Sequence, residues 1–199
     1  KWSGTVEDAF FNGEHFTRNR KLLQPEYEHS GRSAAGAYYI ISADVGRKGC
    51  DTVVCIFKVT PQAQGPAIKS LVNIYTMTDE HMEDQAIKLK KLYYKYKART
   101  LVIDGNGLGI GLVDYMIKSQ EDENGDFYPD FGVENDDDGY YKKYRTNNTE
   151  YDAMYILKAN APINTECHSN AQTQLASGKV KFLIDERAAK EKLLGTAKG

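Results

Sequence analysis

The chain has 199 residues, 41% of them hydrophobic and 27% charged, which suits one globular domain plus an additional segment. Its formal net charge of −2 excludes a protein that is basic over its whole surface, so any nucleic-acid-binding surface must be a local patch. The sequence has no signal-peptide pattern and no apolar run that approaches ~20 residues, so no membrane association and a cytoplasmic location are expected.

Residues 1–37 differ from the rest of the chain. They are rich in charge, glycine and serine, and their aromatic residues follow no sustained period. A flexible Gly/Ser stretch at 30–36 ends the segment, so we expect a linker or the end of a preceding domain here and a core domain over 38–199. The three cysteines, Cys50, Cys55 and Cys167, have no C-x-x-C spacing and are interpreted as reduced packing residues.

Three short runs rich in β-branched and apolar residues begin the core, and they predict strands over 38–45, 52–59 and 68–77. The links between them are short, so the three strands cannot all be parallel. A helix is expected to follow, with Thr78 as its N-cap. Its apolar residues form one stripe at helical spacing: Met82, Ala86, Leu89, Tyr93 and Tyr96.

The second half of the chain alternates between helical and strand patterns around a polar, acidic insertion. We expect a strand over 100–104, a helix over 109–119, an insertion with a small hairpin over 120–148, helices over 150–160 and 165–176, a strand over 179–184, and a helix over 186–194. Strands separated by helices are expected to be parallel. The order therefore predicts an α/β fold with a mixed β-sheet flanked by helices on both faces.

Two aspartates end apolar strands and are followed at once by glycine-rich backbone. Asp44 ends the run from Tyr38, and Asp104 ends the run from Thr100. Two carboxylates from neighbouring strands can hold a hard divalent cation between them, because Mg²⁺ needs only one or two protein carboxylates and completes its shell with water and phosphate oxygens. The pair predicts a metal site at the edge of the sheet.

Other sites are less well supported by the sequence. The run Gly-Asn-Gly-Leu-Gly-Ile-Gly at 105–111 is not a G-x-G-x-x-G motif, and Asp104 before it would face a pyrophosphate with its negative charge. No G-x-x-x-x-G-K-[ST] and no G-x-S-x-G motif occurs. The four histidines are scattered and form no zinc-ligand cluster.

A few further residues are candidates for supporting the metal or contacting DNA. Asp51 follows Asp44 across a glycine turn and either caps that turn or supports the metal site. The cations in this turn and at the far end of the insertion are candidate phosphate contacts: Arg47, Lys48, Lys142, Lys143 and Arg145.

Three segments carry a resemblance to a known family: 43–52 around Asp44, 102–109 around Asp104, and Lys181-Phe182-Leu183-Ile184. The chain resembles the nuclease domain of the large terminase subunit of tailed bacteriophages, the motor that packages viral DNA. The similarity covers residues 38–199, and residues 1–37 resemble the tail of the ATPase domain that precedes this nuclease.

The resemblance implies an RNase H-like fold and an endonuclease that cuts concatemeric double-stranded DNA at the initiation and termination of packaging. It implies a two-metal site for Mg²⁺ or Mn²⁺, with Asp44 and Asp104 as the first two acidic residues. It also implies an N-terminal ATPase domain, the portal protein and the small terminase subunit as partners, and the cytoplasm of the infected bacterial host as location.

The family's third acidic residue lies in a helix well after the last strand. Asp185 and Glu186 follow the 179–184 strand too closely to match that position. The third ligand is therefore expected beyond Gly199, with Asp51 and Asp185 as candidates inside the chain. The domain is accordingly expected to be truncated at its C-terminus and weakly active or inactive by itself.

Two alternatives share some of these features. An RNase H-like resolvase would use the same site but would prefer branched DNA to linear duplex. A non-catalytic module that binds DNA or a partner would retain the acidic pair without depending on Mn²⁺.

Overall fold

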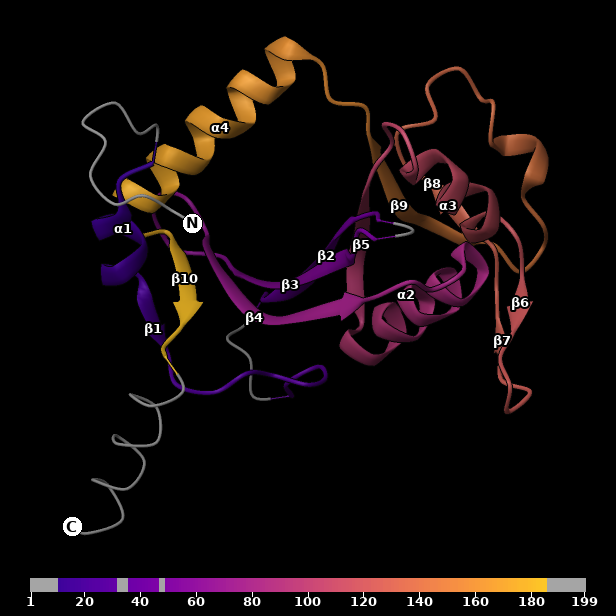
Figure 1. The fold of residues 1–199 in the computed structure, drawn as a ribbon, viewed down its shortest axis with the longest axis horizontal. Coiled ribbons are helices and arrows are strands. Elements are labelled where there is room, and N and C mark those ends of the chain that lie inside the picture. Colours follow the sequence, from indigo (N-terminus) through magenta and orange to yellow (C-terminus); the bar gives the residue numbers. More distant parts are fainter. Residues whose placement is uncertain (1–10, 32–35, 47–48, 186–199) are drawn as a thin grey trace, which may run out of the picture.

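The computed structural model describes residues 11–31, 36–46 and 49–185 (Figure 1). Its elements in chain order are α1 (Gly13–Arg18), β1 (Arg20–Leu22), β2 (Tyr38–Asp44), β3 (Thr52–Thr60), β4 (Ile68–Met77), α2 (Met82–Tyr96), β5 (Ala98–Asp104), α3 (Gly109–Met116), β6 (Gln120–Glu121), β7 (Phe127–Tyr128), β8 (Phe131–Val133), the 3₁₀ helix η1 (Lys142–Tyr144), β9 (Glu150–Leu157), α4 (Ala161–Ala176) and β10 (Val180–Leu183).

Eight strands form one mixed sheet in the order β1-β10-β4-β3-β2-β5-β9-β8. β3 runs antiparallel to both of its neighbours, β2 and β4, as the short links between them require. All other neighbours in this sheet pair in parallel. Because β2, β5 and β9 are parallel, their carboxyl-terminal ends lie at the same end of the sheet.

One face of the sheet is covered by α2 and α3. The predicted apolar stripe of α2 is buried along its whole length, from Met82 to Tyr96. Alternate residues of β2 face this layer and are almost fully buried: Tyr39, Ile41 and Ala43. The residues between them are half-buried, as expected for a strand with one side packed on the core.

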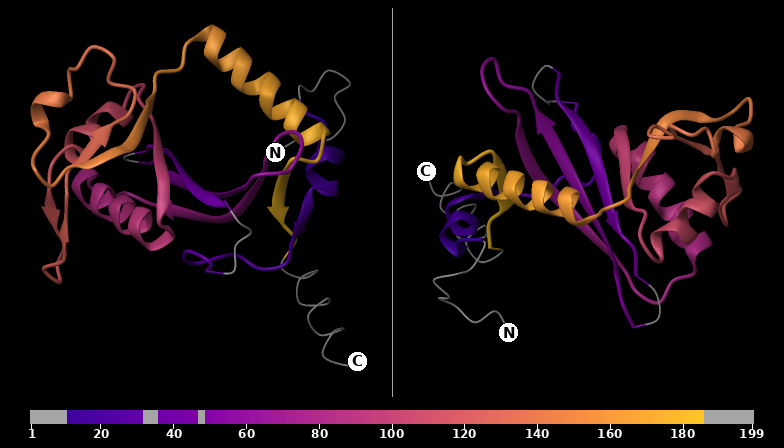
Figure 2. Two further views of the ribbon diagram at one scale, coloured as in Figure 1. Left: turned by 180° about the vertical axis from the view of Figure 1, so that it is seen from behind. Right: turned by 90° about the horizontal axis from the view of Figure 1, so that it is seen from above.

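The other face is much less covered. Figure 1 shows α4 crossing this side of the sheet from the end of β9 to the start of β10, and both views of Figure 2 agree. Only Leu175 of α4 is buried. Apolar side chains on the central strands remain partly exposed, including Val53 at 36% and Ile74 at 49%. Helices thus lie on both sides of the sheet, but only α2 and α3 form a packed layer.

The prediction of a helix over 150–160 is wrong, because this segment forms β9. The strand lies between β5 and β8, and its Ala153, Met154 and Ile156 are buried there. The periodicity of a short apolar run does not distinguish a strand from a helix. This segment forms a strand because it can pair with the free edge of β5. α4 also begins at Ala161, where the Asn160 side chain accepts a hydrogen bond from the Ile163 N–H and caps the helix.

The insertion contains the expected small hairpin, formed by β6 and β7. It also contributes β8, an edge strand of the main sheet that the sequence did not predict. The predicted helix over 186–194 lies outside the described residues. No helix in the described part of the chain is long and apolar enough to cross a membrane.

The described part of residues 1–37 belongs to the same folded unit rather than to a linker alone. β1 adds a strand to the main sheet by pairing with β10. Glu26 then connects three parts of the core: its carboxylate accepts hydrogen bonds from Lys58 and from the Tyr39 hydroxyl, and its carbonyl accepts one from the Tyr96 hydroxyl. The sequence missed this because the contacts are made by single polar side chains far apart in the chain.

The helix α2 contains a buried lysine. Lys90 of α2 is 0% exposed, and its Nζ donates a hydrogen bond to the Lys118 carbonyl at 2.5 Å. Nζ also lies 5.4 Å from the centroid of the Phe131 ring. Burial lowers the pKa of Lys90 to about 8, although the charge of Asp130 acts in the opposite direction.

We expect the free energy of unfolding to increase as the pH rises from about 8 to about 10. In this range native Lys90 has lost its proton, whereas the unfolded lysine, with its ordinary pKa of 10.5, still holds one. The native state then binds fewer protons than the unfolded state, so higher pH favours folding, by at most about 3 kcal/mol. Urea unfolding of the wild type and Lys90→Met across this range measures the effect, and an equal increase in the variant would assign it to other groups.

Candidate metal centre

The fold brings Asp44 and Asp104 to the same edge of the sheet. β2 and β5 are parallel neighbours, and the register pairs Ala43 with Ile103, so that the two aspartates are the next residue on each strand. Neighbouring strands lie about 4.8 Å apart, which places the two Cα atoms at about that separation. Asp44 is exposed and Asp104 is half-buried. The pairing confirms the predicted adjacency of these two strand ends.

Glycines after each aspartate are required by close backbone packing. A Cβ at Gly46 would lie 2.4 Å from the Asp51 carbonyl oxygen, and one at Gly109 would lie 1.6 Å from the Asp104 carbonyl oxygen. A Cβ at Gly105 would meet the Ile156 side chain at 2.4 Å. Gly105 and Gly109 therefore allow the backbone after Asp104 and the start of α3 to pack closely against the ends of β5 and β9.

Hydrogen bonds hold the backbone after Asp104 in place. The Gly105 N–H donates to the Leu157 carbonyl at 2.9 Å and extends the β5–β9 pairing past the aspartate. The Asn106 N–H donates to Asp104 Oδ1 at 3.0 Å, and the Asn106 side chain donates to the Ala159 carbonyl at 3.1 Å. One carboxylate oxygen of Asp104 is thus oriented by the loop that follows it.

A buried polar network holds the backbone after Asp44. The Gly46 N–H donates to Thr52 Oγ1 at 2.8 Å, and the Thr52 hydroxyl lies 2.7 Å from Gln85 Oε1. Gln85 Nε2 donates to the carbonyls of Gly46 and Glu80. Thr52 and Gln85 are 0% and 1% exposed. No local sequence pattern predicts this network, because Gln85 occupies a polar position of α2 and its partners lie elsewhere in the chain.

Gln85→Leu is expected to lower the free energy of unfolding by about 1–3 kcal/mol, because the buried carbonyls and hydroxyl lose their partner. Gln62→Leu is the matched control, since Gln62 is exposed and bonds only to nearby backbone. That control should stay within about 0.5 kcal/mol of the wild type. Urea unfolding of both variants measures the difference, and equal stabilities would show that the network contributes little.

Cys55 lies close to the metal centre. Its strand neighbour in β2 is Ser42, two residues before Asp44. Burial and the charge of Asp44 together raise the pKa of the Cys55 thiol. The thiol therefore stays protonated near neutral pH. Cys55 is half-buried, as expected for a packing residue, whereas Cys50 and Cys167 are exposed, so the prediction that they pack in the core is wrong. All three cysteines are free.

The two secondary acidic candidates lie in different places. Asp51 precedes β3 at the same edge as Asp44, and its Oδ1 accepts a hydrogen bond from the Thr78 hydroxyl at 2.7 Å. This bond connects the start of β3 to the residue after β4. The predicted N-cap of α2 at Thr78 is wrong, because the N-cap residue is His81.

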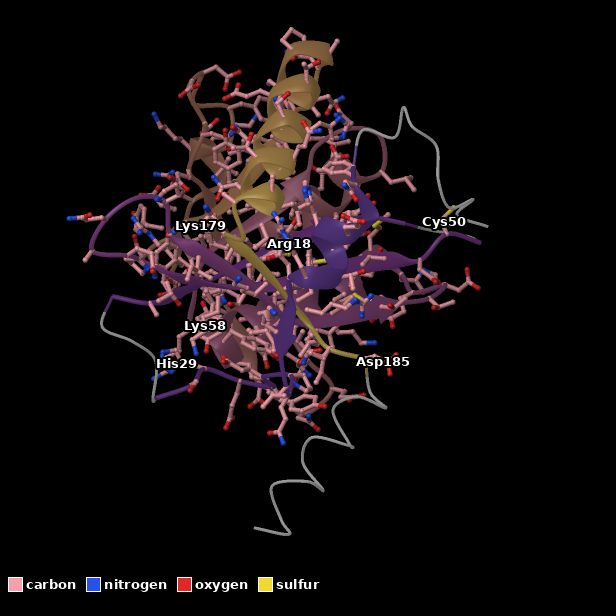
Figure 3. The ribbon with its side chains drawn as sticks, turned by 90° about the vertical axis from the view of Figure 1, so that its left-hand side faces the viewer. Arg18, His29, Cys50, Lys58, Lys179 and Asp185 are labelled. Carbon is pink, nitrogen blue, oxygen red and sulfur yellow. The ribbon has the colours of Figure 1, made fainter. Side chains whose placement is uncertain are left out.

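Asp185 follows β10, and β4 and β3 lie between that strand and β2. At the usual strand spacing this is about 14 Å across the sheet. Figure 3 shows Asp185 well separated from Cys50, which follows Asp44 in the chain. The structure therefore does not bring Asp185 to the two carboxylates.

The predicted DNA-contacting cations fall into two groups. Arg47 and Lys48 lie outside the described residues. Lys142, Lys143 and Arg145 lie in and directly after η1, beyond the β8 edge of the sheet (Figure 1). Arg145 donates a hydrogen bond to the Val133 carbonyl at 3.3 Å. In the sheet, β8 is the edge strand next to β9 and β5, whereas β10 lies toward the opposite edge. This second group is therefore nearer to the strand that carries Asp104 than to β10.

The two carboxylates suit a hard cation that retains water ligands. Both end their strands at an open edge, and both offer oxygen ligands, which Mg²⁺ and Mn²⁺ prefer. Among the residues described, no group of three or more His, Cys, Asp or Glu side chains is placed to hold a metal ion. The residues present therefore fit one ion held by two carboxylates and do not by themselves provide a site for a second.

The mixed sheet, with one antiparallel strand among parallel ones and paired carboxylates at the ends of β2 and β5, defines an RNase H-like α/β domain. No family model and no curated protein matches the chain.

Among solved structures, the chain is similar to the large terminase nuclease of the thermophilic phage G20c. The structure of that nuclease with bound magnesium is 16% identical to this chain, with a TM-score of 0.52, covering 93% of this chain and 79% of the other. The structure with bound cobalt gives the same values. Similarity at this level of identity establishes the shared fold, and it agrees with the resemblance found in the sequence.

Proposed function

We propose that the chain is the metal-dependent endonuclease domain of a viral DNA-packaging terminase. The observation that carries the proposal is the adjacency of Asp44 and Asp104 at the ends of parallel strands in an RNase H-like fold. Its substrate is proposed to be concatemeric double-stranded DNA, cut when packaging begins and ends. The proposed partners are an N-terminal ATPase domain, the portal protein and the small terminase subunit, in the cytoplasm of the infected bacterial host.

Asp44 and Asp104 would hold a Mg²⁺ or Mn²⁺ ion. A bound divalent cation supplies Lewis acidity toward a phosphodiester, and a second ion would allow attacking and leaving oxygens to be stabilised together. The Asn106 N–H orients Asp104, and the Thr52–Gln85 network holds the backbone after Asp44, so both ligands are positioned before the ion arrives. The nuclease of phage G20c, solved with bound magnesium and with bound cobalt, supports a divalent ion.

The proposal includes a third carboxylate from outside these 199 residues. Two ligands would bind a cation weakly, so the chain by itself is expected to cleave DNA slowly, with Mn²⁺ more effective than Mg²⁺ because Mn²⁺ is less strict about geometry. A longer chain with the residues that follow Gly199 should cleave much faster. Equal rates would instead indicate that a residue within the chain completes the site, and Asp51 and then Asp185 would be tested.

The test of the proposed function is a plasmid-cleavage assay with Mn²⁺, with Mg²⁺ and with EDTA. Nicking or linearisation that requires the metal supports the proposal. DNA binding without any cleavage by the longer chain would indicate a non-catalytic module. Preferential cutting of four-way junctions over linear duplex would indicate a resolvase.

The proposed DNA contacts predict a salt effect. Reversing the charge of all five cations, Arg47, Lys48, Lys142, Lys143 and Arg145, should weaken binding to duplex DNA and reduce its dependence on salt. Each lost phosphate contact lowers the slope of log K against log salt by about 0.9. Fluorescence anisotropy at several salt concentrations measures both quantities. An unchanged affinity and slope would place the DNA path elsewhere on the domain.

A further inference from the structure

Three exposed tyrosines gather with the exposed Lys143 and the half-buried Arg145 on the insertion beyond β8 and at the start of β9. The group consists of Tyr140, Lys143, Tyr144, Arg145 and Tyr151, hereafter the aromatic–basic surface. Lys143 Nζ lies 4.2 Å from the centroid of the Tyr140 ring and 5.0 Å from that of Tyr144. The Arg145 guanidinium carbon lies 5.3 Å from the centroid of the Tyr151 ring. Each cation of the surface is therefore placed beside a tyrosine ring.

The rings of this surface are open to solvent, and its cations have no acidic partner. Tyr140, Tyr144 and Tyr151 are 54%, 39% and 63% exposed. Within the described ranges, the ion pairs involve neither Lys143 nor Arg145. Tyrosines that serve the core would be covered, as Tyr39 and Tyr96 are, both at 0% exposure.

Acidic residues precede this surface in the chain, and the carboxylates of two of them, Asp136 and Asp138, accept hydrogen bonds from the backbone. Asp136 is 7% exposed, and its carboxylate accepts hydrogen bonds from the N–H groups of Tyr141 and Lys142. Asp138 Oδ1 accepts one from the Tyr140 N–H. These bonds fix the turn that presents Tyr140, while Glu134, Asp137 and Asp138 remain exposed in this run.

We propose that the aromatic–basic surface binds single-stranded DNA, with tyrosine rings stacked on unpaired bases and Lys143 and Arg145 on phosphates. Proteins bind single strands with this combination of stacking rings and cations. The face of a base is accessible only where strands are separated, because inside a duplex both faces are covered by neighbouring base pairs. The inference rests on the proposed function, since it takes DNA as the ligand of this chain.

β9 connects this surface to the carboxylates. Tyr151 lies near the start of β9, and Tyr155, 37% exposed, lies further along the same strand. Tyr155 pairs in register with Val102, two residues before Asp104. At ordinary strand spacings Tyr155 is about 8 Å from Asp104 between Cα atoms. β9 therefore extends from Tyr151 of the aromatic–basic surface toward the strand ends that carry the carboxylates.

The experiment measures binding of fluorescein-labelled (dT)12 in EDTA by anisotropy, with an abasic oligonucleotide of the same length as a second probe. Both probes have the same phosphates, so only base stacking distinguishes them. We expect (dT)12 to bind at least ~10-fold more tightly than the abasic probe, as expected from one or more stacked bases. The triple variant Tyr140→Ser, Tyr144→Ser, Tyr151→Ser should lose this preference and bind both probes alike.

Two controls separate stacking from structural damage. The triple Tyr→Phe variant keeps the rings and should bind (dT)12 within about twofold of the wild type. Tyr27→Ser should have no effect, since Tyr27 is 63% exposed, as Tyr151 is, but lies in the segment before β2.

A wild type that binds both probes equally would overturn the inference, as would a triple Ser variant that keeps the preference. An equal loss in the Phe and Ser variants would also overturn it, because the hydroxyls rather than the rings would then be responsible. Metal-dependent plasmid cleavage is measured on the same samples. If metal-dependent cleavage persists while the probe preference is absent, the inference fails and the nuclease proposal stands. If the chain binds no DNA, the inference fails, and the plasmid assay on the longer chain decides the nuclease proposal separately.

Discussion

Asp44→Asn is expected to reduce Mn²⁺-dependent plasmid cleavage at least ~100-fold, because a neutral amide replaces one of the two carboxylates that β2 and β5 contribute to the metal centre. The fold should be unaffected, since Asp44 is exposed and ends its strand. Plasmid cleavage, together with calorimetric titration of Mn²⁺, measures both the activity and the loss of ion binding. Thermal unfolding in EDTA should coincide with that of the wild type.

Asp51→Asn is the matched control for this prediction. Asp51 lies at the same edge of the sheet and is also exposed, but its carboxylate already accepts a hydrogen bond from Thr78. Its replacement should leave cleavage within about threefold of the wild type, because the amide oxygen can still accept that bond. If Asp44→Asn cuts as fast as the wild type, or if only Asp51→Asn is inactive, the ligand assignment is wrong.

Gly109→Ala is expected to destabilise the fold by about 3 kcal/mol or more. Its Cβ would lie 1.6 Å from the Asp104 carbonyl oxygen, and a backbone atom cannot move away as the end of a side chain can. To make room, α3 must shift away from the end of β5, which also displaces Asp104. Urea unfolding measures the loss of stability, and the metal titration described above measures the effect on Asp104.

Gly111→Ala is the control within the same helix. A Cβ at Gly111 has no atom within 4 Å, and alanine favours helices over glycine, so stability should increase by up to about 1 kcal/mol. If Gly109→Ala lowers the free energy of unfolding and Gly111→Ala raises it, the close contact at Gly109 causes the effect, rather than a general need for glycine in α3. A mild effect of Gly109→Ala, similar to that of Gly111→Ala, would contradict the packing described for α3.

Sequence patterns predicted the elements whose signals are local. The strand from Ile68 to Met77 and the buried stripe of α2 follow from unbroken apolar periodicity, and the structure confirms both. The short links predicted that the first three strands could not all be parallel, and β3 indeed runs antiparallel to β2 and β4. Asp44 and Asp104 were identified because each is a charged residue at the end of an apolar strand before glycine, and that position is visible in the sequence alone.

Only the tertiary structure decided features that depend on partners far away in the chain. Residues 150–157 form a strand rather than a helix because β5 offers an open edge, which no local pattern records. β1 joins the sheet through β10, and β10 follows it by more than 150 residues. The Thr52–Gln85 network and the closeness of Gly109 to Asp104 likewise arise only when α2, α3 and the strand ends pack together. The sequence determined which residues are the metal ligands to test, whereas the packing of distant segments determined how each would be held.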